Sequence, residues 1–143
     1  MVASELSSES IMNGEGIFTI TQWNEEVIKE KCEQVKTVHA SVVQAYEGDM
    51  KGEGHVEFIM SYKSGISACF VGFEEFIGVI DGRRGTVTFK HDGSFEDGIA
   101  RSAFTVVAGT ATGELSGVNL SGHFTSAESG KANYSFTEQG NGK

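Results

Sequence analysis

Two adjacent carboxylates and a histidine are the residues of this chain whose types and spacing could support acid–base chemistry. The segment GFEEFIGVIDGRRGTVTFKHDG, residues 72–93, carries Glu74 and Glu75 within an apolar run and His91 near its end. Successive side chains of a β-strand point to opposite faces, so only one of the two glutamates can face a core. An unpaired buried charge costs several kcal/mol, so an inward carboxylate must be paired, protonated or hydrated.

Turn chemistry decides which glutamate points inward. Asp81-Gly82 is a type I′ hairpin signal, and an even-length loop there puts Glu74 on the same face as His91. We therefore predict that Glu74 points into the protein, with His91 directly opposite or one diagonal away. Glu75 is predicted to point outward, within reach of Lys90.

The neighbouring hairpins predict the same inner face. A two-residue turn at Asp97-Gly98 places Phe104 on the same face as His91 in the next strand. A three-residue loop at 63–65, a type I turn followed by a left-handed glycine, sets Phe58 beside Phe70. The inner face is mostly aromatic, and the residues that we predict to contact a ligand are Tyr46, Phe58, Met60, Tyr62, Phe70, Phe76, Phe89, Phe104 and Tyr134.

Short runs rich in Val, Ile, Phe and Thr follow one another between glycines, and the chain has 19 Gly and no Pro. This pattern is typical of many short strands separated by glycine-containing turns. The first run, IFTITQW, begins at Ile17, and the others span 37–48, 53–63, 67–80, 84–96, 99–108, 117–126 and 131–137. We predict an all-β protein, a closed or nearly closed eight-stranded antiparallel barrel.

One segment is ambiguous between helix and other structure. NEEVIKEKCEQVK, residues 24–36, opens with Asn24, a good N-cap, and places Ile28, Cys32 and Val35 at helical spacing. The pattern is short and heavily charged, so a short helix or an irregular crossing is predicted here. The domain prediction is a flexible leader at 1–14, one barrel at 15–138, and a loose tail at 139–143.

Charge and composition disfavour several classes of partner. The formal net charge is −9 and the sequence pI is about 4.8, with Lys and Arg scattered along the chain. No basic stripe is available for nucleic acid or for an anionic membrane. No apolar stretch reaches the length of a membrane span. MVASELSSESIMNGEG, residues 1–16, has neither the basic n-region nor the apolar h-region of a signal peptide, so a cytoplasmic location is expected. Cys32 and Cys69 lie in dissimilar segments, so free thiols are expected.

Metal and cofactor chemistry also find little support in the sequence. His39, His55 and His123 fall on the opposite strand parity from His91, and no HxH or HExxH pair is present. The glycine-rich stretches lack the strand, GxxxxGK[ST] and helix context of a phosphate-binding loop. We predict no metal site and no cofactor.

The outward positions of the predicted strands carry an extensive apolar group. Its members are Val43, Ala45, Cys69, Val71, Phe73, Ile77 and Val79. A patch of this size is more than a solvated face normally carries. We expect a homodimer or a higher homo-oligomer, with the strand at 67–80 in the interface.

Several pieces of the chain together resemble a bacterial family catalogued as domain of unknown function 3224. They are the GEG turn, the stretch from Gly72 to Phe76, GRRG with the following His and Gly, and GTATGELSG; the resemblance spans about residues 15–137. That family is similar to the eight-stranded barrels of the allene oxide cyclase and dirigent type. The resemblance implies an antiparallel barrel with a central cavity and a tendency to oligomerise, but no reaction.

Three functions remain open on this sequence. The first is a binding module whose interior holds one small apolar or amphipathic molecule. The second is a cofactor-independent isomerase or cyclase in which Glu74 and His91 move a proton. The third is a packed barrel that acts through an oligomer interface. The interior volume, and whether Glu74 and His91 line it, distinguishes among them.

Overall fold

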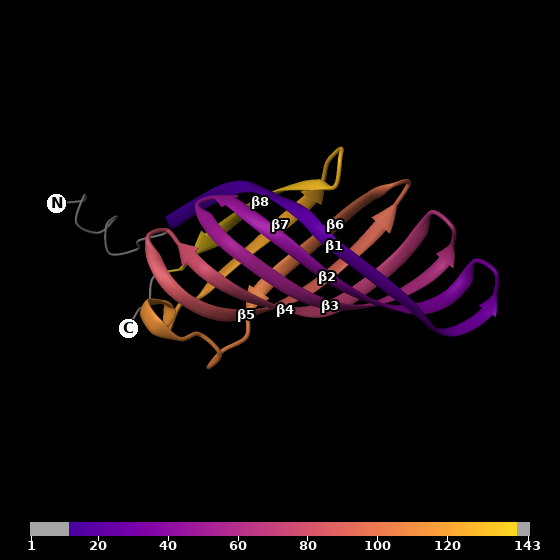
Figure 1. Ribbon diagram of the computed structural model, residues 1–143, viewed down its shortest axis with the longest axis horizontal. Coiled ribbons are helices and arrows are strands. Elements are labelled where there is room, and N and C mark those ends of the chain that lie inside the picture. Colours follow the sequence, from indigo (N-terminus) through magenta and orange to yellow (C-terminus); the bar gives the residue numbers. More distant parts are fainter. Residues whose placement is uncertain (1–11, 140–143) are drawn as a thin grey trace.

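The chain forms a closed antiparallel barrel in a computed structural model that describes residues 12–139 (Figure 1). Each of eight strands is hydrogen-bonded to the next, and the last pairs with the first. The strands are β1 (Met12–Cys32), β2 (Val35–Gly48), β3 (Met50–Ser64), β4 (Ser67–Ile80), β5 (Arg83–Glu96), β6 (Ile99–Val106), β7 (Leu120–Ser126) and β8 (Lys131–Glu138). The predicted all-β fold is confirmed.

Strict alternation of side chains builds the core. In β4 every second residue from Ala68 to Phe76 is buried and the residues between them are exposed. The same pattern repeats in β3 and β7. Glu74 is buried and Glu75 is exposed, as predicted. Because the period is two, each strand sends its aromatic and aliphatic set into one shared interior.

The two Asp-Gly turns have the predicted type I′ geometry. Asp81 and Gly82 have φ of 51° and 82°, and Asp97 and Gly98 have φ of 53° and 84°. Each pair forms a two-residue loop between hydrogen-bonded strands. Asp tolerates the left-handed region and Gly enters it without steric cost, so these dipeptides set the strand register.

The β3–β4 hairpin corrects the predicted register. Its loop is the two residues 65–66, closed by the pair Ser64 and Ser67, and the extra residue enters as a bulge between Tyr62 and Ser64. The cross-strand partner of Phe58 is therefore Gly72 and not Phe70, although the Phe58 and Phe70 rings still pack edge to face with centroids 4.9 Å apart. The predicted inward and outward faces are nevertheless correct. One extra residue in the loop and one bulged residue in the strand change the alternation of side chains in the same way.

The predicted helix or irregular crossing at 24–36 is wrong, because this segment continues β1 and turns into β2. β1 pairs with β2 as far as Cys32 and Val35, with three register shifts along the way. All residues from Thr21 to Gln34 are exposed. The hairpin reaches beyond the shorter strands at one end of the barrel (Figure 1). A solvated two-stranded ribbon accommodates the many charges, and pairing with β2 supplies the backbone hydrogen bonds.

The two ends of the barrel differ. At one end the connection between β6 and β7, with its 3-10 turn Gly113–Leu115, lies beside the barrel (Figure 1). Leu115 and Val118 from this connection are buried in the core. Leu115 packs there within the same core cluster as Met50 and Ile80. The other end carries the β1–β2, β3–β4, β5–β6 and β7–β8 turns, and no comparable connection crosses it in the described part of the chain.

The predicted leader at 1–14 and tail at 139–143 lie mostly outside the described residues. Of the leader, residues 12–14 belong to β1 and pair with the end of β8. Residues 12–139 contain no helix with the length and hydrophobicity that a membrane span requires.

Candidate functional site

Glu74 and His91 meet inside the barrel. Glu74 projects inward from β4 and His91 from β5, and Glu74 Oε1 lies 2.7 Å from His91 Nε2. Glu74 pairs across the ladder with Phe89, and His91 pairs with Gly72, so the contact runs along a diagonal. The exposed fractions are 0% for Glu74 and 1% for His91. The predicted pair exists, and it is fully buried.

Three more side chains complete the hydrogen bonding of this pair. The Tyr46 hydroxyl donates to Glu74 Oε2 at 2.6 Å, and the Gln44 amide nitrogen donates to the same oxygen at 3.2 Å and to the Tyr46 oxygen at 3.1 Å. On the other side, His91 Nδ1 lies 3.2 Å from Ser102 Oγ. We call Gln44, Tyr46, Glu74, His91 and Ser102 the buried polar cluster.

The cluster leaves Glu74 fully satisfied. Tyr46, Gln44 and the His91 ring converge on its two oxygens, and a carboxylate can only accept. Within the described residues, no buried side-chain nitrogen or oxygen lacks a hydrogen-bond partner. A buried network in which every polar group is hydrogen-bonded stabilises one arrangement of the core. Removing one member leaves its partners buried without hydrogen bonds, which lowers stability.

A glycine provides the space that the carboxylate occupies. Gln44 on β2 pairs with Gly54 on β3, which pairs in turn with Phe76 on β4. A Cβ atom at Gly54 would overlap the carboxylate oxygen of Glu74 and would lie 3.0 Å from Tyr46 Cε1. The missing side chain therefore lets the Glu74 carboxylate reach across to β2.

The environment of Tyr46 keeps its hydroxyl protonated. Burial raises the pKa of Tyr46 well above its usual value, and the charge of Glu74 and the hydrogen bond to it raise the pKa further. Both effects penalise the phenolate, since it would be a second negative charge away from water. Tyr46 is thus a permanent donor to Glu74 at physiological pH.

A cavity of about 330 Å³ lies at the end of the barrel that carries the β5–β6 and β7–β8 turns. Most of its lining is apolar or aromatic: Phe18, Ile20, Trp23, Val42, Gln44, Phe58, Met60, Tyr62, Phe70, Phe95, Gly98, Ala100, Phe124, Ser126, Ala127, Gly130, Lys131 and Ala132. Concave sites with an apolar wall and few polar groups are typical of small-molecule binding.

Four of the nine predicted ligand-contacting residues line this cavity, namely Phe58, Met60, Tyr62 and Phe70. The other five do not: Tyr46, Phe76, Phe89, Phe104 and Tyr134 pack in the buried core away from the cavity. The two candidate catalytic residues, Glu74 and His91, do not line the cavity either. Their cluster touches it only through Gln44.

Sequence reasoning missed part of the cavity wall. Phe18, Phe95 and Phe124 line the cavity but were not among the predicted contacts. Strand parity was sufficient to turn Phe124 inward, but parity does not say which end of a barrel stays open. Trp23, the single tryptophan of the chain, lines the cavity and can report its occupation.

Tyr134 has a structural position instead. Its hydroxyl donates to the carbonyl oxygen of Glu47 at 2.8 Å and accepts from the backbone N–H of Met50 at 2.8 Å. Burial raises the pKa of Tyr134 to about 12. The side chain thus ties the β2–β3 turn to β8.

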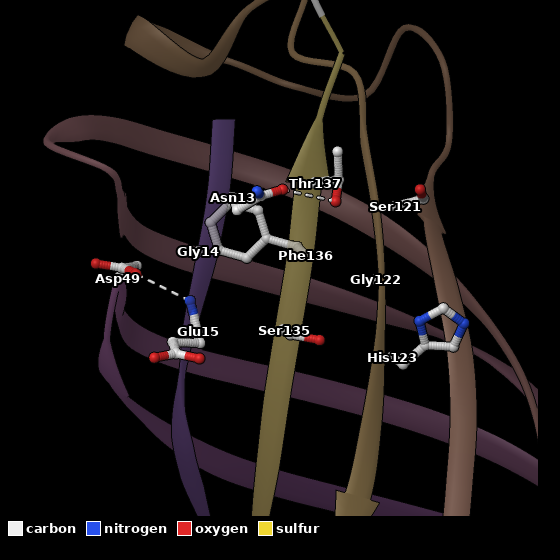
Figure 2. A pocket seen from close by; sticks show the side chains of 10 residues that line it. All are labelled: Asn13, Gly14, Glu15, Asp49, Ser121, Gly122, His123, Ser135, Phe136 and Thr137. Atoms are coloured by element: carbon white, nitrogen blue, oxygen red, sulfur yellow. Dashed lines mark hydrogen bonds between the residues drawn. The ribbon is translucent and has the colours of Figure 1, made fainter. Parts of the chain in front are cut away.

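The outer wall carries a second, wider depression, of about 600 Å³, over β8 between β1 and β7 (Figure 2). Gly14 and Gly122 lie at inward positions of β1 and β7, where a Cβ atom would meet the core rings of Phe136 and Phe104, so the depression is lined by the outward side chains between them. Two hydrogen bonds cross its rim, from the Glu15 N–H to Asp49 and from Thr137 to Asn13 (Figure 2). Its polar groups are already partnered or point into solvent, so it makes a weaker candidate site than the interior cavity.

The other histidines lie on the outer face, as predicted. His39 pairs with Glu57 at 2.6 Å, and His55 pairs with Glu53 at 3.1 Å. In the part of the chain that the structure describes, no three His, Cys, Asp or Glu side chains gather closely enough to hold a metal ion. Cys32 and Cys69 are both exposed and free.

Comparison with known proteins supports the fold but assigns no activity. A family model described as "Protein of unknown function (DUF3224)" matches residues 14–137. The chain is also similar to a crystal structure of a protein with unknown function from the DUF3224 family of Shewanella oneidensis MR-1. The two share 22% sequence identity and a TM-score of 0.70, covering 90% of this chain and 96% of that one. No curated protein matches.

Proposed function

The chain belongs to the DUF3224 family of proteins of unknown function, and we propose that its barrel binds one small apolar or amphipathic molecule in the interior cavity. The observation that carries this proposal is the cavity itself, which measures about 330 Å³ and has a mostly apolar lining. This volume is at the lower end of the usual range for small-molecule sites. Because the interior is hollow at one end, a wholly packed barrel is the weaker alternative.

The alternative of a cofactor-independent isomerase or cyclase has less support. A general acid or base must come within hydrogen-bond reach of the proton that it transfers. Glu74 and His91 are fully buried, do not line the cavity, and use their polar atoms on each other and on cluster partners. The expected likeness to allene oxide cyclase barrels stays a prediction from the resemblance.

We also propose that the protein is a homo-oligomer, most simply a dimer. The outer face of β3 and β4 exposes Ile59, Val71, Phe73 and Ile77, each more than two-fifths accessible. Ile59 and Val71 are direct cross-strand partners, so the apolar surface is continuous there. Light scattering at micromolar concentration tests this, and a mass near 15.3 kDa would contradict it. Nucleic acid and membranes are not proposed as partners, given the net charge of −9.

The cytoplasm is the proposed location. Exposed free thiols, as at Cys32 and Cys69, suit a reducing compartment.

The binding proposal can be tested with Trp23 as an intrinsic reporter. Titration with the uncharged probe N-phenylnaphthylamine should change Trp23 fluorescence in a saturable way. Ala100→Phe places a ring in the cavity from β6 and should abolish this, whereas Ala103→Phe, exposed on the same strand, should not. Equal responses of the two variants would contradict the proposal. Native mass spectrometry of protein taken directly from cells should show a retained small molecule.

A further inference from the structure

Gln44 is the one side chain, among the residues that the structure describes, that belongs both to the cavity wall and to the buried polar cluster. It is 2% exposed. It projects from β2 beside two apolar wall residues, Phe18 and Val42. A buried amide in such a wall sets the hydrogen-bonding character of the cavity at that point.

The orientation of the Gln44 amide follows from its partners. The Glu74 carboxylate can only accept hydrogen bonds, and the Tyr46 hydroxyl uses its hydrogen on Glu74. The Gln44 atom that faces both of them must therefore be the NH₂ group, as its distances of 3.2 Å and 3.1 Å indicate. The opposite orientation would place the amide oxygen against a carboxylate oxygen.

The remaining atom, Gln44 Oε1, faces the cavity. Within residues 12–139 it accepts no hydrogen bond from the protein, yet no buried side-chain oxygen there is left without a partner. Oε1 is therefore not enclosed by protein, and the accessible space next to Gln44 is the cavity. The cavity thus presents a fixed hydrogen-bond acceptor within an apolar wall.

We infer that the ligand is an uncharged molecule with an apolar body and a hydroxyl or N–H group at one end, and that it inserts this donor toward Gln44 Oε1. The inference rests on the proposed function and adds the chemical class of the ligand. A buried acceptor rejects a ligand that cannot donate, because binding would then leave the acceptor without water or a partner.

An anionic group does not suit this position. The amide oxygen offers a lone pair, and the Glu74 carboxylate lies directly behind the amide. The His91 ring already contacts Glu74 and does not line the cavity. Lys131 also lines the cavity, but its exposed side chain belongs to the end open to solvent. A carboxylate next to Gln44 would thus be desolvated without a counter-charge.

Two probes with the same ring system separate donor recognition from apolar binding. Naphthol can donate a hydrogen bond, and methoxynaphthalene with its oxygen at the same ring position cannot. Both are titrated by Trp23 fluorescence into the wild type, into Gln44→Met and into Ser126→Ala. Met keeps the length of the side chain and removes the amide, while Ser126 is another polar residue of the wall. The quantity compared is the preference for naphthol, which is the ratio of the two dissociation constants.

The expected result is that Gln44→Met lowers the preference for naphthol about tenfold, as loss of one hydrogen bond in an apolar site would, while Ser126→Ala leaves the preference unchanged. An unchanged preference in Gln44→Met, with both probes still bound, would overturn this inference and keep the proposed function. Binding of neither probe to the wild type would count against the proposed function itself.

A crystal structure of the wild type with naphthol provides the second measurement, needed if Gln44→Met does not fold. The probe oxygen within hydrogen-bond distance of Gln44 Oε1 supports the inference. A probe that binds with its oxygen toward Lys131 overturns it.

Discussion

The Gln44 amide nitrogen lies 3.2 Å from Glu74 Oε2, so a polar group of the cavity wall is held in place by a carboxylate that the cavity does not reach. Glu74 thereby has a defined role without contacting a ligand. Its Oε2 atom accepts hydrogen bonds from the Gln44 amide and the Tyr46 hydroxyl, which orients Gln44. Its Oε1 atom contacts the His91 ring. Substitutions in the buried polar cluster and at the residues packed around it should therefore change the free energy of unfolding.

Replacing Glu74 should cost stability. Glu74→Leu leaves Tyr46, Gln44 and His91 without their shared acceptor, and we expect the free energy of unfolding to fall by about 1 to 3 kcal/mol or more. The melting temperature of a domain of this size would drop by several degrees. Glu75→Leu, exposed on the adjacent position, is the matched control and should change stability little. A Glu74→Leu protein more stable than the wild type would contradict a structural role.

Stability should decrease in alkali because of Tyr46. Its pKa is raised in the folded state, so above about pH 10 the unfolded chain loses the tyrosine proton while the folded protein keeps it. The contribution is fully present below the unfolded-state pKa and declines as the pH rises toward the folded-state pKa, by at most about 1.4 kcal/mol per pH unit. Urea denaturation across this range should show a shallower decline in Tyr46→Phe. If the free energy of unfolding declined with pH equally steeply in the wild type and in Tyr46→Phe, the raised pKa of Tyr46 would be refuted.

Removal of the Tyr134 hydroxyl should loosen the β2–β3 turn. Tyr134→Phe takes away the acceptor of the Met50 N–H and a donor to Glu47, at an expected cost of about 1 to 3 kcal/mol. Hydrogen exchange at the Met50 amide should accelerate more than exchange in β4. Ser135→Ala, on the exposed face of the same strand, serves as control. Unaltered exchange at Met50 in Tyr134→Phe would show that the turn does not depend on this side chain.

A methyl group at Gly54 should disturb the buried polar cluster. Its Cβ atom would overlap the Glu74 carboxylate, so Gly54→Ala forces either the carboxylate or β3 to move. We expect a loss of stability comparable with that of a core overpacking substitution, about 1 to 3 kcal/mol. Gly65→Ala is the control, because the atom nearest to a methyl group at that position would be the Gln34 amide nitrogen at 3.5 Å. Thermal denaturation of both variants makes the comparison, and equal melting temperatures would show that the cluster tolerates the added methyl group.

The sequence by itself determined which face each residue of the main strands occupies. Asp81-Gly82 and Asp97-Gly98 are turn dipeptides whose backbone preferences set strand parity locally, and both adopt the expected positive φ. Parity then turned Glu74 and His91 inward and His39, His55 and His123 outward, as observed. These are consequences of a period of two, which needs no knowledge of the distant partners.

Only the tertiary structure decided how the strands align, where β1 ends and which part of the interior is hollow. Residues 24–32 form a strand because β2 supplies their hydrogen bonds, a pairing that their charged, weakly periodic sequence does not encode locally. Phe58 aligns with Gly72 because the β3–β4 hairpin closes on a two-residue loop with a bulge after Tyr62, and the Phe58 ring occupies space that a side chain at position 72 would need. Leu115 and Val118 from the β6–β7 connection are buried in the core, whereas the cavity opens among residues of the β5–β6 and β7–β8 turns and does not reach Glu74. Cavity position depends on the summed volumes of side chains from all eight strands, and that sum exists only after the barrel has closed.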